Sequence, residues 1–156
     1  MKSRGFTLIE MVVVVAVVAV LAAIAVPVVQ LSAQRARESE LRTALRQIRE
    51  GIDTYKRYAD EGRIARASDA SGYPPKLADL VQGVPDAKSP GGAHIYLLRR
   101  IPRDPFNTDA ALEASETWGL RSYTSTADAP AEGADVFDVY SRASGTGLNG
   151  VPYREW

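Results

Sequence analysis

Cysteine is missing from this chain of 156 residues, and histidine occurs once, as His94. Without cysteine there can be no disulfide, thiolate nucleophile or cysteine-ligated zinc site. No second titratable partner for His94 can be identified from the sequence, so we expect it to lie on the surface or pack against neighbours. No other set of residues forms a catalytic pattern. The sequence therefore predicts a protein that is not an enzyme and has no catalytic residues.

An excess of either charge is also missing. The chain has 19 basic and 19 acidic residues, so its overall field does not favour nucleic acid, and we expect no nucleic-acid partner. The charges are unevenly distributed, however. Residues 11–29 carry none, whereas residues 35–66 are densely charged with both signs. An uncharged segment is thus followed by a highly polar one.

The uncharged segment is long enough to cross a membrane. Met11 to Val29 are 19 consecutive apolar residues if Pro27 is included. As a helix they would extend about 28 Å, close to the hydrocarbon thickness of a bilayer. Glu10 stands at the entrance of this run, where a membrane would begin. A carboxylate in a membrane helix costs about 2.5–3.5 kcal/mol at the centre and less near the interface, so this residue needs an explanation.

Two interpretations of the run leave Glu10 unexplained. The first is a cleaved secretory signal, because residues 23–25 have the small-x-small form and Lys2 and Arg4 make a cationic start. The second is a plain single-pass anchor with a cytoplasmic N-terminus, which the same two cations favour. In either case the acid would have to lie shallow enough to reach water at the headgroups.

The helical pattern continues beyond the apolar run. Residues 30–40 are polar without an apolar stripe, as expected of a solvated helix that leaves a bilayer. An apolar stripe then recurs at steps of three and four, which predicts a helix that packs on its own domain, while most charged residues lie on other faces. Gly62 is a plausible cap for its C-terminus. The stripe consists of Leu41, Leu45, Ile48, Ile52, Tyr55, Tyr58 and Ala59.

The remaining residues indicate short elements separated by turns. Residues 71–81 predict a turn into a short helix, with Pro75 near its first position. Two strands are expected at 118–125 and 135–142, joined by a long polar loop as an antiparallel hairpin. A long helix followed by a small antiparallel sheet predicts an α+β fold.

A third interpretation comes from resemblance. The segment "RGFTLIEMVVVVAVVAVLAAIAVP", residues 4–27, resembles the N-terminus of the type IV pilin superfamily, which includes pilins and type II secretion pseudopilins. The resemblance implies that prepilin peptidase cuts between Gly5 and Phe6 and that Phe6 becomes an N-methylated terminus. Glu10 then matches the acid that this family has near the new terminus, and Pro27 matches its helix-bending proline.

This resemblance supplies a physical reason for the acid. Cleavage creates a positive amine on Phe6, and Glu10 of a neighbouring subunit can neutralise it in apolar surroundings. Such a buried pair sets the register of stacked subunits more than it adds net stability. Pro27 should kink or locally loosen the helix, and in a filament this position could melt and stretch. Glu10, Phe6 and Pro27 are therefore expected to serve assembly.

The rest of the chain resembles the major (G-type) pseudopilin of the type II secretion system. The similar segments are "GYPPKLADLV", "YLLRRIPRDPF" and "DVFDVYSR", followed by a glycine-rich tail that ends in Trp156. The implied organisation is a leader at 1–5, a transmembrane and filament-core helix at 6–29, a continuing amphipathic helix at 30–62 and a periplasmic globular head at 63–156. The inner membrane would hold the subunit by a single pass, with a cytoplasmic N-terminus, until it joins a periplasmic filament.

The same resemblance implies the partners. They are further copies of the chain in a helical homopolymer, prepilin peptidase, minor pseudopilins, inner-membrane lipid, and an inner-membrane assembly platform with a cytoplasmic ATPase. G-type pseudopilins typically also bind calcium in an acidic loop, but residues 141–156 contain one acid, Glu155, with Asn149 as a lesser donor. Calcium prefers six to eight oxygen ligands, several of them carboxylates. We therefore expect no cofactor and assign no calcium ligand, and the loop would be held by glycine turns and aromatic packing.

Two alternatives in function stay open at this point. A type IV pilin for adhesion, motility or DNA uptake would share every feature before residue 30. A membrane-anchored periplasmic binding domain that never polymerises would share the anchor but would tolerate loss of Glu10.

Overall fold

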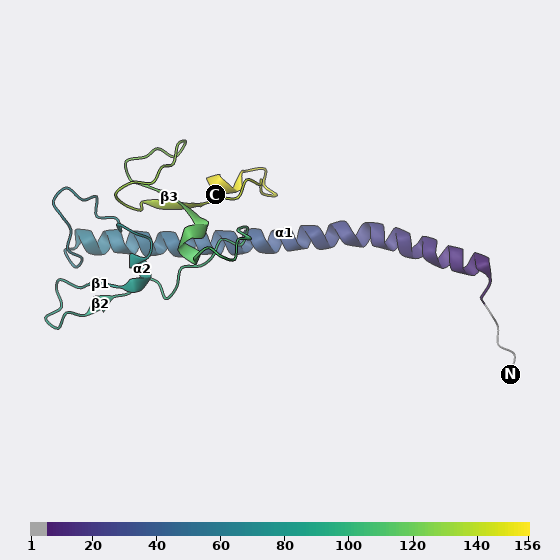
Figure 1. The fold of residues 1–156 in the computed structure, drawn as a ribbon, viewed down its shortest axis with the longest axis horizontal. Helices are drawn as coiled ribbons and strands as arrows, with labels where there is room; N and C mark the ends of the chain where they lie inside the picture. The colour runs from purple at the N-terminus through teal and green to yellow at the C-terminus, as the bar shows by residue number, and fades with distance from the viewer. Residues whose placement is uncertain (1–5) are drawn as a thin grey trace. The chain divides into compact units, whose positions relative to one another are not determined.

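The computed structural model describes residues 6–156, so the predicted leader at 1–5, including Gly5, lies outside the described residues. Its residue contacts form two units, one ending at Arg37 and the other comprising Glu38–Trp156, which we call the C-terminal unit. The long helix α1 contributes to both. The elements, labelled in Figure 1, are α1 (Leu8–Asp60), α2 (Asp79–Gln82), β1 (Val84–Pro85), β2 (His94–Ile95), η1 (Ala114–Thr117), β3 (Trp118–Arg121), β4 (Asp138–Ser141) and η2 (Tyr153–Glu155).

The apolar run forms the first part of α1, and the helix is assigned without interruption through Pro27. Proline has no N–H, so the carbonyl of Ala23 has no α-helical donor at this position. In a membrane helix such a gap can be accommodated by local adjustment of the backbone. The role of Pro27 in a filament stays a prediction.

The predicted apolar stripe on α1 is confirmed as the centre of the core. Leu41, Ile48 and Ile52 are 0–1% exposed, and they pack in one cluster with Trp118 and Val139 from the β3/β4 hairpin. Side chains that recur at three and four residues lie on one face of a helix, so a single stripe can cover the sheet. Tyr55 is buried and Tyr58 is partly buried against the same cluster, as predicted.

The C-terminus of α1 is capped by the predicted glycine. Gly62 has φ +69°, a left-handed conformation that glycine adopts without the steric cost of a Cβ. Its N–H donates to the carbonyl of Ala59 at 3.1 Å, and the N–H of Arg63 donates to the carbonyl of Tyr58 at 2.8 Å. These two bonds form a Schellman motif, which satisfies carbonyls that the ending helix leaves unpaired.

The two predicted strands are confirmed, although both are shorter than expected. β3 and β4 pair antiparallel with Trp118 opposite Ser141 and Arg121 opposite Asp138. The sequence did not predict β1 and β2, a second antiparallel pair of two residues each, in which Val84 lies opposite Ile95. Strands this short have no alternating pattern to detect. The long helix and the small antiparallel sheets confirm the α+β class.

The prediction that a short helix starts near Pro75 is wrong. α2 begins at Asp79 and has four residues. The preceding residues 75–78 form bends and turns, and the carbonyl of Pro74 accepts the N–H of Val136 at 2.8 Å from another part of the chain. The carboxylate of Asp79 then accepts the N–H of Lys76 at 2.9 Å, which holds a turn where the helix was expected.

Candidate functional site: the N-terminal turn and its apolar helix

The large apolar side chains at the start of α1 are exposed. Phe6 and Leu8 are 81% and 83% exposed, and the large hydrophobic residues from Ile9 to Leu31 remain open as well. By length and composition this helix can cross a membrane, and no residue in its most apolar window is buried by the described chain. An apolar surface of this extent requires a cover, which a bilayer or neighbouring subunits can provide. The segment therefore fits a single-pass membrane anchor.

Thr7 and Glu10 close the first turn of this helix. The N–H of Thr7 donates to Glu10 Oε2 at 2.8 Å, and the hydroxyl of Thr7 donates to the same oxygen at 2.9 Å. In return, the N–H of Glu10 donates to Thr7 Oγ1 at 3.3 Å. Because Leu8 is the first helical residue, Thr7 is the N-cap and Glu10 the third residue of the helix. This reciprocal pattern is a capping box, which satisfies two donors that the helix start would leave unpaired.

The capping box fixes where the acid points. It turns the Glu10 carboxylate back toward the main chain at Thr7, immediately after Phe6. The structure thus brings two predicted site residues, Phe6 and Glu10, to the same end of α1. Pro27 lies farther along the same helix, and Gly5 lies outside the described residues. The processing and assembly roles of these four residues stay predictions.

Thr7 is the residue of this site that the sequence prediction missed. Its signal is nevertheless present, because Thr-x-x-Glu directly before an apolar run is the pattern of a capping box. The prediction considered Glu10 as an unusual acid at a membrane boundary. It did not consider the acid as a helix cap.

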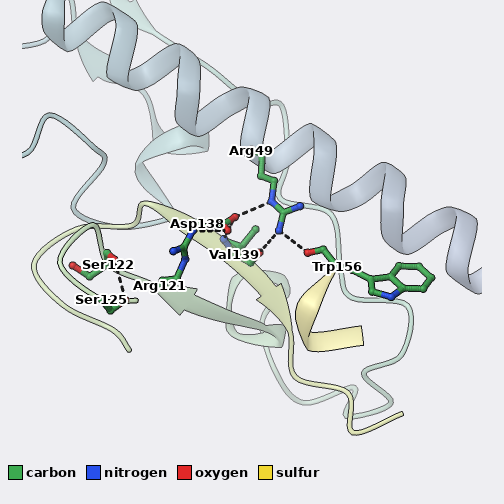
Figure 2. A network of polar contacts seen from close by, with 7 residues as sticks. All are labelled: Arg49, Arg121, Ser122, Ser125, Asp138, Val139 and Trp156. Atoms are coloured by element: carbon green, nitrogen blue, oxygen red, sulfur yellow. Dashed lines mark hydrogen bonds and ion pairs between the residues drawn. The ribbon is translucent and has the colours of Figure 1, made fainter. Parts of the chain in front are cut away.

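In the C-terminal unit, Arg49 joins α1 to the end of the chain, as Figure 2 shows. Its Nε donates to Asp138 Oδ1 at 2.8 Å. Its Nη2 donates to the main-chain oxygens of Val139 at 3.1 Å and of Trp156 at 2.7 Å. Arg121 contacts the other carboxylate oxygen of Asp138 at 3.2 Å, so one acid lies between two arginines. The sequence pattern placed Arg49 only away from the apolar stripe and gave no sign of these partners.

Glu38 makes a second connection between α1 and the C-terminal residues. It is a buried acid, 4% exposed, in the segment that the sequence pattern described as polar on all sides. Its Oε1 accepts the N–H of Leu148 at 2.9 Å and the hydroxyl of Tyr153 at 3.0 Å. These partners are more than a hundred residues away in sequence, so no local pattern could reveal them.

Asp135 connects two loops of the C-terminal unit. Its carboxylate accepts the hydroxyl of Ser122 and the N–H of Tyr123, both at 2.8 Å, together with the hydroxyl of Ser71. Burial raises the pKa of Asp135, but the hydrogen bonds from Ser71, Tyr123 and Ser122 outweigh it and hold the pKa below the ordinary aspartate value. The ionised form of Asp135 therefore stabilises the folded unit.

Comparison with known proteins supports a class for the N-terminal site. The family model of the prokaryotic N-terminal methylation motif matches residues 1–26. Neither a curated protein nor a solved structure gives a significant match to the chain. The motif, together with the exposed apolar helix that follows it, supports a type IV pilin-like subunit that prepilin peptidase processes.

Proposed function

We propose that this chain is a structural subunit of a type II secretion pseudopilus, a periplasmic filament that drives protein export. The observation that carries the proposal is the methylation motif at the start of an apolar helix that the described chain leaves uncovered. Before assembly, lipid of the inner membrane covers this helix. In the filament, the helices of neighbouring copies cover it, so it passes from lipid to protein without entering water.

Cleavage after Gly5 produces the charged group on which assembly depends. It removes the leader and leaves the amine of Phe6 next to the capping box of Thr7 and Glu10. Glu10 of the neighbouring copy neutralises this amine, since an isolated charge in apolar surroundings is strongly disfavoured. The pair fixes the register between copies, while the capping box holds the carboxylate at the helix end in advance.

The partners follow from this assignment. Prepilin peptidase cuts and methylates the N-terminus at Gly5 and Phe6, and minor pseudopilins join the same filament. An inner-membrane platform with a cytoplasmic ATPase supplies the work of extension. The subunit itself is a structural protein, which contributes to the filament through its contacts with other subunits.

The order of motifs in the C-terminal unit favours a secretion pseudopilus over a type IV pilus. The segment around Pro75, the segment ending at Phe106 and the strand β4 follow one another as in G-type pseudopilins. Many major pilins of longer surface pili have a C-terminal disulfide loop, and this chain has no cysteine.

The test is deletion of the gene in the native host, complemented by the wild-type chain. We expect proteins that normally leave the cell to accumulate, folded, in the periplasm of the deletion strain, and export to return on complementation. Normal export combined with loss of surface pili, twitching motility or DNA uptake would instead identify a type IV pilin.

A further inference from the structure

The last residues of the chain form a tight loop, which we call the C-terminal segment (residues 143–156). It is closed by its own hydrogen bonds, among them Gly147 N–H to the carbonyl of Val151 at 2.9 Å and Tyr153 N–H to the carbonyl of Gly145 at 3.1 Å. The ring of Trp156 lies so close to Gly147 that an added Cβ would meet it at 2.3 Å. A side chain at position 147 would therefore have to displace the Trp156 ring.

Several oxygens of this segment already accept hydrogen bonds from donors within it. Asn149 Oδ1 accepts the N–H of Val151 at 3.1 Å, and the main-chain oxygen of Val151 also accepts the indole N–H of Trp156 at 3.2 Å. The one acid of the segment, Glu155, is exposed and lies 3.7 Å from Arg154. Within residues 6–156 no group of three or more His, Asp or Glu side chains could hold a metal ion. Nor does any buried side-chain polar atom in this range lack a hydrogen-bond partner.

These residues do not fit the calcium site that the pseudopilin resemblance implies. Calcium prefers six to eight oxygens, several of them from carboxylates, whereas this segment has one acidic side chain and several of its oxygens accept hydrogen bonds from its own N–H groups. A cation at those oxygens would compete with the hydrogen bonds that close the segment, and the segment has no second acidic side chain to compensate.

Two charged side chains of α1 make the attachment instead. Glu38 accepts hydrogen bonds from Leu148 and Tyr153 of the segment, and Arg49 donates to the main-chain oxygen of Trp156. Glu38 and Arg49 are about three turns apart, roughly 16 Å along the axis, and nearly in line on one helix face. We propose that this pair fastens the C-terminal segment to α1 and makes the fold of the C-terminal unit independent of calcium.

Aromatic packing supports the same attachment. The ring of Tyr153 stacks on Phe106 with centroids 4.1 Å apart, and the guanidinium of Arg42 lies 4.3 Å above the ring of Trp156. Arg42 belongs to α1, so cation–π contact adds to the hydrogen bonds of Glu38 and Arg49. The proposal concerns the fold alone, and it holds whether the filament is a pseudopilus or a pilus.

The first test is thermal unfolding of the full processed chain in detergent, followed by circular dichroism. A ligand that binds the folded state alone must raise the unfolding midpoint by mass action. We expect midpoints within about 1 °C of each other in millimolar EDTA and in millimolar calcium, which is less than the several degrees that a saturated site would add. A midpoint that calcium raises by several degrees, or that EDTA lowers, would overturn the proposal.

The second test uses matched variants in the same assay. Glu38→Leu leaves two donors without their acceptor, and we expect its midpoint to fall by about 5–10 °C. Glu38→Gln retains an acceptor oxygen and should keep most of the stability, and Glu40→Leu, at an exposed position, is the control. Arg49→Met is expected to lose stability, in contrast to Arg46→Met, which is exposed.

The readout specific to the attachment is trypsin cleavage after Arg154 and amide exchange at residues 143–156. Both should rise in Glu38→Leu and in Arg49→Met at a temperature where the rest of the unit is folded. Unchanged midpoints and unchanged protection of the segment in both variants would contradict the role of the pair. Secretion in the host is measured separately, so a failure of this proposal is distinguishable from a failure of the proposed function.

Discussion

Glu10 has two tasks that depend on different properties of its side chain. As the third residue of the helix it accepts hydrogen bonds from Thr7, and a neutral amide can do this as well as a carboxylate. As the partner of the Phe6 amine in a filament it needs its negative charge. Substitutions can therefore separate the cap from the charge.

We expect the Glu10→Gln subunit to insert into the membrane, to be cleaved normally and to keep its helix start. Its filament assembly should fall at least about tenfold, because loss of one partner of a buried charge pair is strongly destabilising. Glu10→Ala should lose the capping box as well and assemble no better. The measurement is the amount of sheared filament, normalised to the amount of processed subunit in the membrane. Wild-type amounts of filament in both variants would contradict the role of the Glu10 charge, whereas a wild-type chain that forms no filament at all would favour a membrane-anchored domain that does not polymerise.

The lowered pKa of Asp135 predicts how the stability of the C-terminal unit depends on pH. Because its pKa is lowered in the folded state, its contribution is present above the unfolded value of about 3.9 and is lost as pH falls through the folded value. Asp135→Asn should be less stable than the wild type at neutral pH, and the difference should shrink as pH falls below about 4. Denaturant unfolding across this pH range measures it, with Asp128→Asn, at an exposed position, as the control. A difference that does not change with pH would contradict the role of the ionised carboxylate.

The β3/β4 hairpin depends on one close approach. Gly119 lies opposite Tyr140 in the register, and a Cβ at Gly119 would meet the ring of Tyr140 at 2.3 Å. The ring thus covers the glycine and occupies the space that a side chain would need. Forcing the ring away disturbs packing in the strand pair that covers the stripe of α1.

We expect Gly119→Ala to lower the free energy of unfolding by about 1–3 kcal/mol, which is typical of overpacking. Gly91→Ala is a suitable control, because an added Cβ there meets nothing within 4 Å and the backbone is not left-handed. Chemical denaturation of the full chain in detergent gives both values. If the two variants lose equal stability, the close approach does not account for the glycine.

At the level of elements, sequence patterns predicted what is local and periodic. The stripe on α1, its glycine cap and the two strands of the larger hairpin follow from spacing within a few residues. The pairing of β1 with β2 could not be predicted, because two-residue strands have no period. The start of α2 was missed because residues 75–78 form bends and turns, in which the Asp79 carboxylate accepts the N–H of Lys76.

The candidate site shows the same distinction. Phe6 and Glu10 were predicted because the N-terminal segment has a specific pattern, and Thr7 was missed although its capping signal is local. Glu38 and Arg49 lie among the charges of α1 and differ from them only in their distant partners. Only the folded chain distinguishes a charge that attaches the C-terminal segment from one that is solvated.

At the scale of the whole molecule, one helix belongs to two units that require different surroundings. From Leu8 to Leu31 the large apolar side chains of α1 are exposed, whereas from Leu41 onward its apolar stripe is buried in one core with residues of the β3/β4 hairpin and of the C-terminal segment. A chain of this kind needs a membrane or other copies around its first unit, while its second unit has a core of its own. This division is what a filament subunit requires, because the core of the filament and its surface are made by different parts of the chain.

The intact mass of the chain, extracted from the membrane of its native host, tests the central claim most directly. Processing as a prepilin predicts a mass that begins at Phe6 and carries one added methyl group. A product that begins at Val26 would show a cleaved secretory signal, and an uncut chain would show a simple anchor. Either of these two results would contradict the account of the chain as a filament subunit.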